Sequence, residues 1–253
     1  MKKNLFLGLF LMICVSAFGQ VSEADADKAF KIIDEANNQL AYKGDYSCTV
    51  SLVVEKPGKP KENLQFKFFE RMDKDMFTMV QLFPEADKGN GYLKEGDNIW
   101  SYDPISRKFS HSSLKEAIGD SDIKVDDMSN DNDSFRKNYK VTGLREEKLG
   151  KYDVYVISLE ATTSLPAYEK SDFYIRKDIK LLLKKADFSA SGRLMSTVLI
   201  PKYAKTEKGY VGYQTIIRDE LNPGEQTQQV ISDLSFEPLP DRIFTKAYLE
   251  GLN

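Results

Sequence analysis

The stretch Asp45–Glu55, which reads DYSCTVSLVVE, alternates apolar and polar residues. One side of the extended chain is apolar, and the other side is polar except for Val53. The apolar side carries Tyr46, Cys48, Val50, Leu52 and Val54. A two-residue period is typical of a β-strand with one buried face. The stretch therefore predicts a strand whose apolar face covers either a packed core or a bound ligand.

The first twenty residues, MKKNLFLGLFLMICVSAFGQ, have the order of a secretory signal peptide: two lysines, an apolar run and then small residues. The run is too short to cross a membrane as a permanent helix. Small residues at Ala17 and Gly19 predict cleavage after Gly19, which leaves residues 20–253 as a single predicted domain. Lipidation at Cys14 is the alternative, and it is disfavoured because Ile13 stands where lipoprotein signals have a small residue.

Charge and cysteine content narrow the class of protein. The formal net charge is −3, and removal of the two signal-peptide lysines leaves 34 basic against 39 acidic residues, a net charge of −5. The absence of a basic bias argues against a nucleic-acid partner. No later segment approaches the roughly 20 apolar residues of a membrane helix. Cys48 is then the only cysteine, so an intramolecular disulfide is not possible. These features predict a protein of the Gram-negative periplasm, with secretion as the open alternative.

The rest of the chain predicts one long helix followed by many strands. An amphipathic helix is predicted over Ser22–Lys43, ending at Gly44. Further helices are predicted at Ser113–Ile118 and Asp241–Glu250, and an acidic surface loop over Gly119–Ser134. The predicted strands after the first are Asn63–Arg71, Met76–Phe83, Gly91–Leu93, Ile99–Tyr102, the region of Phe109, Tyr152–Glu160, Ser171–Arg176, Leu181–Ala190, Leu194–Lys205, Tyr210–Glu220 and Gln226–Phe236. Short links between them predict antiparallel pairing.

These elements predict a mainly β protein of the α+β class, with one large antiparallel sheet and a few helices. A single sheet of about ten strands curls, because its strands twist and a long open sheet does not stay flat. Two or three helices are few for the wide concave face that results. We therefore expect an incompletely filled apolar cavity, which suits a lipid-like ligand.

Residues suited to catalysis are scarce. His111 is the only histidine, and no G-x-S-x-G motif is present. One histidine and one cysteine cannot form a zinc site, and no phosphate-binding glycine loop occurs. The acidic loop fails the EF-hand spacing, so a solvated loop is favoured over a calcium site or a lid. The sequence thus predicts no enzyme, no metal and no cofactor, with a glycosidase-like carboxylate pair as the remaining enzymatic alternative.

The segment GDNIWSYDP at Gly96–Pro104 resembles the strand motif of the LolA family of periplasmic lipoprotein carriers. The order of parts also agrees: a secretory signal, an amphipathic helix, the alternating strand DYSCTVSLVV, SFRKNYKV at Ser134–Val141 and SFEPLPDRIF at Ser235–Phe244. The chain most resembles the divergent outer-membrane lipoprotein-sorting branch, because Ser164–Glu225 is longer and richer in hairpins than in the housekeeping carrier.

This resemblance implies an incomplete, half-open antiparallel β-barrel whose hydrophobic concave face is covered by helices. It implies a monomeric carrier that accepts lipoprotein acyl chains, or other lipids, from an inner-membrane transporter and passes them to an outer-membrane acceptor. Burial of each acyl methylene is favourable by about 0.8 kcal/mol, which would hold a lipid in transit. The alternatives are a sensor of mislocalised lipoproteins and an accessory subunit of an envelope export system.

Aromatic residues crowd the first half of the predicted sheet, and three methionines nearby add adaptable apolar surface. The residues expected to form the cavity wall are Tyr46, Val50, Leu52, Val54, Phe66, Phe68, Trp100 and Tyr102. Those expected on the underside of a helical lid are Phe30, Ile33 and Leu40.

Overall fold

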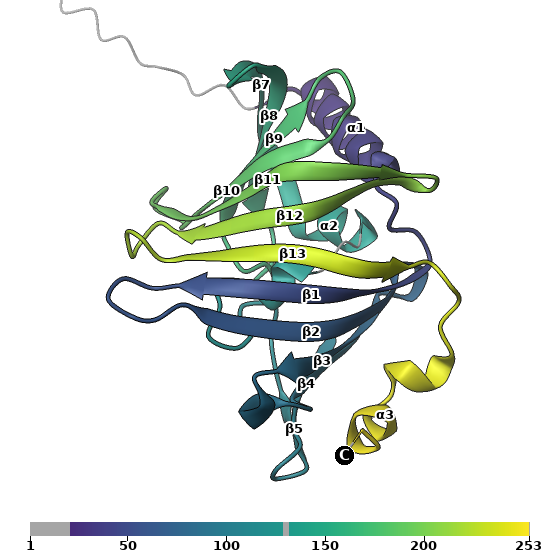
Figure 1. Cartoon of the computed structure of the whole chain (residues 1–253). Coiled ribbons are helices and arrows are strands. Elements are labelled where there is room, and N and C mark those ends of the chain that lie inside the picture. The colour runs from purple at the N-terminus through teal and green to yellow at the C-terminus, as the bar shows by residue number, and fades with distance from the viewer. Residues whose placement is uncertain (1–20, 129–131, 253) are drawn as a thin grey trace, which may run out of the picture.

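The computed structural model describes residues 21–128 and 132–252, so the predicted signal peptide and its cleavage site lie outside the described residues. The strands in these ranges form one antiparallel sheet in the order β6-β5-β4-β3-β2-β1-β13-β12-β11-β10-β9-β8-β7 (Figure 1). The strands are β1 Asp45–Glu55, β2 Glu62–Arg71, β3 Met76–Phe83, β4 Gly91–Glu95, β5 Asn98–Asp103, β6 Lys108–His111, β7 Tyr139–Leu149, β8 Tyr152–Ala161, β9 Lys170–Arg176, β10 Leu182–Phe188, β11 Leu194–Thr206, β12 Gly209–Asp219 and β13 Gln226–Ser235. Because β6 and β7 are unpaired edges, the sheet is not closed.

Helices are few in the described residues. They are α1 Glu23–Gln39, α2 Asn132–Asn138 and α3 Lys246–Glu250, with 3₁₀ turns η1 Met72–Lys74, η2 Glu85–Asp87, η3 Val125–Met128 and η4 Asp241–Phe244. Within residues 21–128 and 132–252, none is long and apolar enough to cross a membrane. A mainly β chain with an open, barrel-like antiparallel sheet confirms the predicted fold class.

Strand β1 lies in the middle of the sheet, paired with β2 on one side and β13 on the other. Its predicted apolar face is confirmed, because all five residues of that face are buried. They pack with the facing residues of β2 and β3, namely Leu64, Phe66, Phe68, Phe77 and Met79. This cluster forms the core on the concave side of the sheet.

Helix α1 covers the β7–β9 end of the concave face (Figure 1). Ser22 is its N-cap, since Oγ of Ser22 accepts a hydrogen bond from the backbone N–H of Asp25 at 3.1 Å. The predicted helix is too long at its other end. Leu40 is extended and bridges to Tyr210 of β12, and the N–H of Ala41 donates to the carbonyl of Tyr210 at 2.9 Å. This pairing replaces the last helical turn.

The segment 112–128 crosses the concave face over β1 and β2. The helix predicted at Ser113–Ile118 is wrong, because this stretch forms turns held by a bridge between Ala117 and Lys124. The prediction of a solvated loop over Gly119–Ser134 is wrong for 121–125, whereas Gly119 and Asp120 are exposed and residues 129–131 lie outside the described residues. Ile123 and Val125 are buried in the same cluster as the apolar face of β1, so two apolar residues hold an otherwise acidic segment on the sheet.

The C-terminal segment η4–α3 packs on the outer face of the sheet, against β3–β5. Thr78, which alternates with the inward-facing Phe77, donates its hydroxyl hydrogen bond to the carbonyl of Ile243 at 2.8 Å. Leu249 of α3 is fully buried among residues of the outer face. The expectation that helices cover the concave face therefore holds for α1 and α2 but not for α3.

Candidate ligand-binding cavity

A cavity of about 300 Å³ lies on the concave face, beneath α1 and α2. This volume is at the low end of the range of about 300–1,000 Å³ that is typical of small-molecule pockets. Its floor comes from β1, β2 and β9–β13, and the segment 112–128 contributes one wall. Apolar side chains that line it include Val50, Phe68, Val198, Ile200, Ile217 and Ile231.

The helices supply the upper wall of the cavity. Ile33 and Ala36 of α1 point into it, and Phe135 of α2 joins them. Phe135 stacks on Tyr139 with ring centroids 4.8 Å apart and lies 5.6 Å from the ring of Phe173. These aromatic contacts fix α2 over β7 and β9, so the upper wall is built from both helices.

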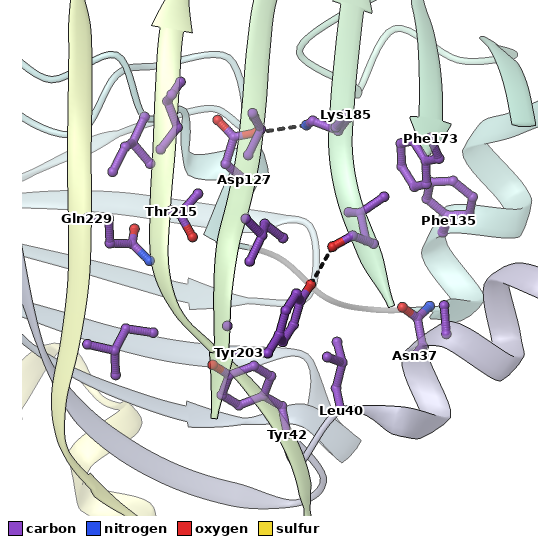
Figure 2. Close-up of a pocket in the computed structure, with 18 of the residues that line it drawn as sticks. Asn37, Leu40, Tyr42, Asp127, Phe135, Phe173, Lys185, Tyr203, Thr215 and Gln229 are labelled. Carbon is purple, nitrogen blue, oxygen red and sulfur yellow. Dashed lines mark hydrogen bonds and ion pairs between the residues drawn. The ribbon is translucent and has the colours of Figure 1, made fainter. Parts of the chain in front are cut away.

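The cavity has a polar end formed by β9, β10 and η3. Figure 2 shows Lys185 and Asp127 facing one another there, with Nζ of Lys185 2.8 Å from Oδ1 of Asp127. Nζ of Lys185 also lies 3.3 Å from Oδ2 of Asp187, and Ser171 donates a hydrogen bond to Oδ1 of Asp187 at 2.6 Å. Among the described residues that line the cavity, Asp127 and Lys185 are the only charged ones.

Asp187 is fully buried behind Lys185. Burial raises the pKa of this carboxyl to about 6, with the nearby charge of Asp127 acting in the same direction and Lys185 opposing it. At neutral pH the cluster of two carboxylates and one ammonium therefore carries an excess of negative charge.

The opposite end of the cavity is aromatic (Figure 2). The hydroxyl of Tyr203 donates to the carbonyl of Leu182 at 2.6 Å, and the rings of Tyr42 and Tyr46 lie 4.8 Å apart. Burial raises the pKa of Tyr42 and of Tyr203, so both phenols stay neutral. The cavity thus changes from charged to aromatic along the direction of its strands.

Glu70 lies beside this aromatic end, where the hydroxyl of Tyr46 donates a hydrogen bond to its carboxyl group. Burial raises the pKa of Glu70 to about 8, although the Tyr46 hydrogen bond and the charge of Lys94 oppose the shift. The buried Lys94 is itself paired with Asp75. At neutral pH Glu70 is therefore mainly protonated and adds no strong charge to the cavity wall.

The predicted residues fall into three groups. Tyr46, Val50, Phe68, Ile33 and Leu40 line the cavity. The second group shares the concave face or its helix but packs beside the cavity, and consists of Leu52, Val54, Phe66 and Phe30. Whether the lining residues bind a ligand stays a prediction.

Trp100 and Tyr102 are the third group, and their predicted place in the cavity wall is corrected. In β5 it is Ile99 that faces the concave core, so Trp100 and Tyr102 face outward and pack near Leu249 of α3. The ammonium of Lys246, also in α3, lies 4.3 Å from the centre of the Trp100 ring. The C-terminal segment packs over this face, where Tyr102 is buried and Trp100 is half-buried, which is why they resemble core residues.

Sequence reasoning missed the contribution of the second half of the sheet. The two-residue alternation of Val198 with Ile200, Thr215 with Ile217 and Gln229 with Ile231 is the signal that could have found it. Lys185 and Asp127 carry no such signal, because 58 residues separate them in the sequence.

Other groups suited to chemistry lie away from the cavity. His111 is exposed and its ring lies 5.8 Å from that of Trp100. In the described part of the chain, one cluster of three carboxylate side chains could hold a metal ion, because their ligand atoms lie within 4.8 Å of one another. The cluster consists of Asp122, Asp219 and Glu225. Asp219 already accepts hydrogen bonds from its own turn, which accounts for its place without a cation.

Comparisons place this architecture among known proteins. A family model with the description "-like: Uncharacterized protein" matches residues 73–251, more than half of the chain. No curated protein matches the sequence significantly.

Several solved structures have the same fold. A LolA superfamily protein from Nitrosomonas europaea is 22% identical with a TM-score of 0.77, over 87% of this chain and 98% of that chain. A putative outer-membrane lipoprotein-sorting protein domain from Vibrio parahaemolyticus is 20% identical with a TM-score of 0.78, over 89% and 99%. A DUF1329 family protein from Desulfovibrio piger is 20% identical with a TM-score of 0.76, over 89% and 98%. The predicted LolA-like resemblance is confirmed at the level of the fold.

Proposed function

Because the chain belongs to the family of uncharacterized proteins whose model matches residues 73–251, and has a divergent LolA-like fold, we propose that it is a non-catalytic lipid carrier. In this proposal residues 20–253 form one carrier domain in the periplasm. The domain binds acyl chains of lipoproteins, or other lipids, in the concave cavity and sorts them toward the outer membrane.

The single observation that carries the proposal is the cavity itself. It lies between the sheet and the helices, and aliphatic and aromatic side chains make up most of its lining. Transfer of apolar surface from water into such a site is favourable by about 25 cal/mol per Å². An acyl chain of ten methylenes would gain roughly 8 kcal/mol before the cost of ordering it is subtracted. This energy suits reversible carriage.

A carrier of this kind needs two partner proteins. An inner-membrane transporter would load the cavity, and an outer-membrane acceptor would empty it. The solved structures of similar fold include a putative outer-membrane lipoprotein-sorting domain, which supports this direction of transfer. Release requires that the acceptor bind the chain more tightly than the cavity does, because a carrier can shift an equilibrium only by its difference in affinity.

The test is to produce the full chain in a Gram-negative host, purify it without detergent and identify co-purified lipids by mass spectrometry. Thr215 of β12 lines the cavity, whereas its neighbour Gln214 lies on the opposite face of the same strand. We expect the wild type and Gln214→Trp to carry about equal amounts of lipid, and Thr215→Trp to carry little because its indole fills the cavity. A wild type that carries no lipid and extracts none from vesicles would overturn the proposal.

A further inference from the structure

We propose that the polar end of the cavity is a head-group subsite that accepts an uncharged head bearing hydroxyl or amide donors and rejects an anionic one. This inference rests on the proposed lipid carriage and adds the chemistry of the cargo. Its residues are Lys185 and Asp127, which face one another in Figure 2, together with Asp187 behind Lys185 and Ser171, which donates to Asp187.

The position of the cluster follows from strand register. Ser171 of β9 is paired with Asp187 of β10, and Asp187 is paired in turn with Ser196 of β11. These residues form one polar row across three strands. Further along β10, in the direction of the aromatic end, come Lys185 and then Leu182, both of which line the cavity. A ligand along the strands therefore has one end at charged groups and the other at aromatic rings.

The charges of the cluster disfavour an anion. Lys185 is the only cation among the described lining residues, and two carboxylates already lie within 3.3 Å of its Nζ atom. Its charge is therefore more than compensated. A carboxylate or phosphate head placed beside Lys185 would lie next to Asp127 and Asp187, and like charges repel more strongly in a partly buried site than in water.

The hydrogen-bonding groups of the cluster favour a donor. Each ionised carboxylate offers about four acceptor positions and no donor. Oδ2 of Asp187 makes no hydrogen bond within the described residues, although it is fully buried. The hydroxyl of Ser171 already donates its hydrogen bond to Oδ1 of Asp187. Asp187 does not line the cavity, so the carboxylate that a bound head can reach is Asp127. Asp127 accepts from Lys185 and from the backbone N–H of Lys124 at 2.9 Å, which leaves further acceptor positions on its two oxygens. A hydroxyl or amide head can donate to these positions without adding a negative charge.

The aromatic end explains why the tail takes the other direction. Leu40, Tyr42 and Tyr203 line that end, and Tyr203 has its hydroxyl proton committed to the carbonyl of Leu182. Its ring and the ring of Tyr42 therefore present mainly apolar surface. An acyl chain has no hydrogen bonds to water that contact with such rings would break, whereas a charged head would lose its hydration there.

The test compares two ligands with the same twelve-carbon chain, 1-monolauroylglycerol and laurate. Each would displace a neutral fluorescent naphthylamine from the purified full chain at pH 8, below its micellar concentration. We expect monolauroylglycerol to displace the dye at a concentration at least tenfold lower than laurate. Equal or tighter binding of laurate would overturn the inference. Failure of both ligands and of the dye to bind would overturn lipid carriage itself, so the two failures are distinguishable.

Two substitutions in one segment sharpen the test. Asp127→Asn keeps the shape of the side chain and removes one of the two carboxylate charges at Lys185, so the preference for monolauroylglycerol should fall at least threefold. Asp122→Asn is the matched control, because Asp122 contacts Thr227 outside the cavity lining. Its preference should equal that of the wild type. An unchanged preference in folded Asp127→Asn protein would overturn the role of the cluster.

Discussion

Glu70 is a carboxyl group placed where apolar side chains dominate. It is 5% exposed, and Phe66 and Phe68 precede it on the same face of β2. Its main polar partner is the hydroxyl of Tyr46, which donates to it from the neighbouring strand. Because burial raises the pKa of Glu70 to about 8, while the carboxyl titrates near 4.5 in the unfolded chain, the folded protein holds this proton over a range in which the unfolded chain releases it.

This difference predicts a stability that falls with rising pH. Between about pH 4.5 and 8 the folded state binds one more proton at Glu70 than the unfolded state, so the free energy of unfolding decreases by up to about 1.4 kcal/mol per pH unit from this group. Glu70→Gln mimics the protonated carboxyl and removes the titration. In urea unfolding of both proteins from pH 5 to 9, the free energy of unfolding of the variant should rise relative to that of the wild type as the pH increases. A constant difference between them would contradict the assigned pKa.

The sequence predicted the positions of some single residues and not of others. The face of β1 was predictable because its alternation is strict, and Tyr46 and Val50 do line the cavity. Trp100 and Tyr102 were placed on the wrong face, because β5 is apolar on both sides. The cause is the C-terminal segment more than 130 residues away, which covers the outer face there. Periodicity in the sequence predicts that a side chain is buried, but it does not predict which segment of the chain covers it.

The junction between α1 and the β11–β12 hairpin holds the helix against the sheet. Gly209 has φ of +137°, and a Cβ atom there would lie 2.6 Å from the carbonyl oxygen of Gln39. The close approach allows the bridge between Leu40 and Tyr210. Because Leu40 and its neighbour Tyr42 both line the cavity, this junction also positions the aromatic end.

Substitution of Gly209 should therefore be costly. Gly209→Ala meets backbone that cannot move without breaking the junction, and we expect a loss of roughly 2–4 kcal/mol in the free energy of unfolding. Gly192→Ala is the matched control, since Gly192 also has a positive φ, +85°, but no neighbour lies within 4 Å of its Cβ position. It should cost only about 1 kcal/mol. Equal losses in chemical denaturation would show that the backbone conformation, and not the junction, sets the cost.

Arg71 holds the C-terminal segment to the outer face. Its guanidinium makes two hydrogen bonds to Asp45, at 2.8 and 3.0 Å, and also contacts Asp241 and the carbonyl of Leu239. The guanidinium lies 4.9 Å from the centre of the Phe244 ring. One buried side chain thus joins β1, β2 and the segment that precedes α3.

Loss of Arg71 should release this segment. Arg71→Met keeps the apolar stem but leaves the carboxylate of Asp45 without its charged partner and with only the backbone N–H of Leu239, so we expect a loss of about 2 kcal/mol and faster hydrogen exchange at 239–250. Asp241→Asn is the control, because the side chain of Asp241 is 88% exposed and its pair is screened by solvent. Its loss should be much smaller. Unchanged exchange in Arg71→Met would contradict the anchoring role.

Elements differed in how well the sequence predicted them. The predicted positions of the strands from β8 to β13 agree with the structure to within a few residues, and from β9 onward the links are short and rich in turn-forming residues. Strand β7 was not predicted, because it is an edge strand whose polar stretch Arg145–Lys148 is exposed and carries no alternation. The prediction for segment 112–128 was wrong because its few apolar residues are buried through contacts with strands that are distant in the sequence. No local pattern encodes such contacts.

The cavity follows from the geometry of the sheet. Strand twist curls a sheet of this width, and the edges β6 and β7 do not meet. Helix α1 fills the concave side at the β7–β9 end, and the segment 112–128 fills it over β1 and β2. The space between these two covers, over β9–β13 and part of β1 and β2, is the part that neither fills. Because α3 lies on the outer face, it contributes nothing to filling this space.

A molecule with such a gap should gain stability from whatever fills it. A ligand at one hundred times its dissociation constant adds about 2.7 kcal/mol to the free energy of unfolding, which raises the melting temperature of a chain of this size by roughly 5–10 °C. We expect this shift with monolauroylglycerol in the wild type and in Gln214→Trp, whose indole lies outside. Thr215→Trp should show almost no shift, because its side chain occupies the space that the ligand would take. If calorimetry gives the same shift in all three proteins, the ligand binds elsewhere and the gap between the two covers is not the binding site.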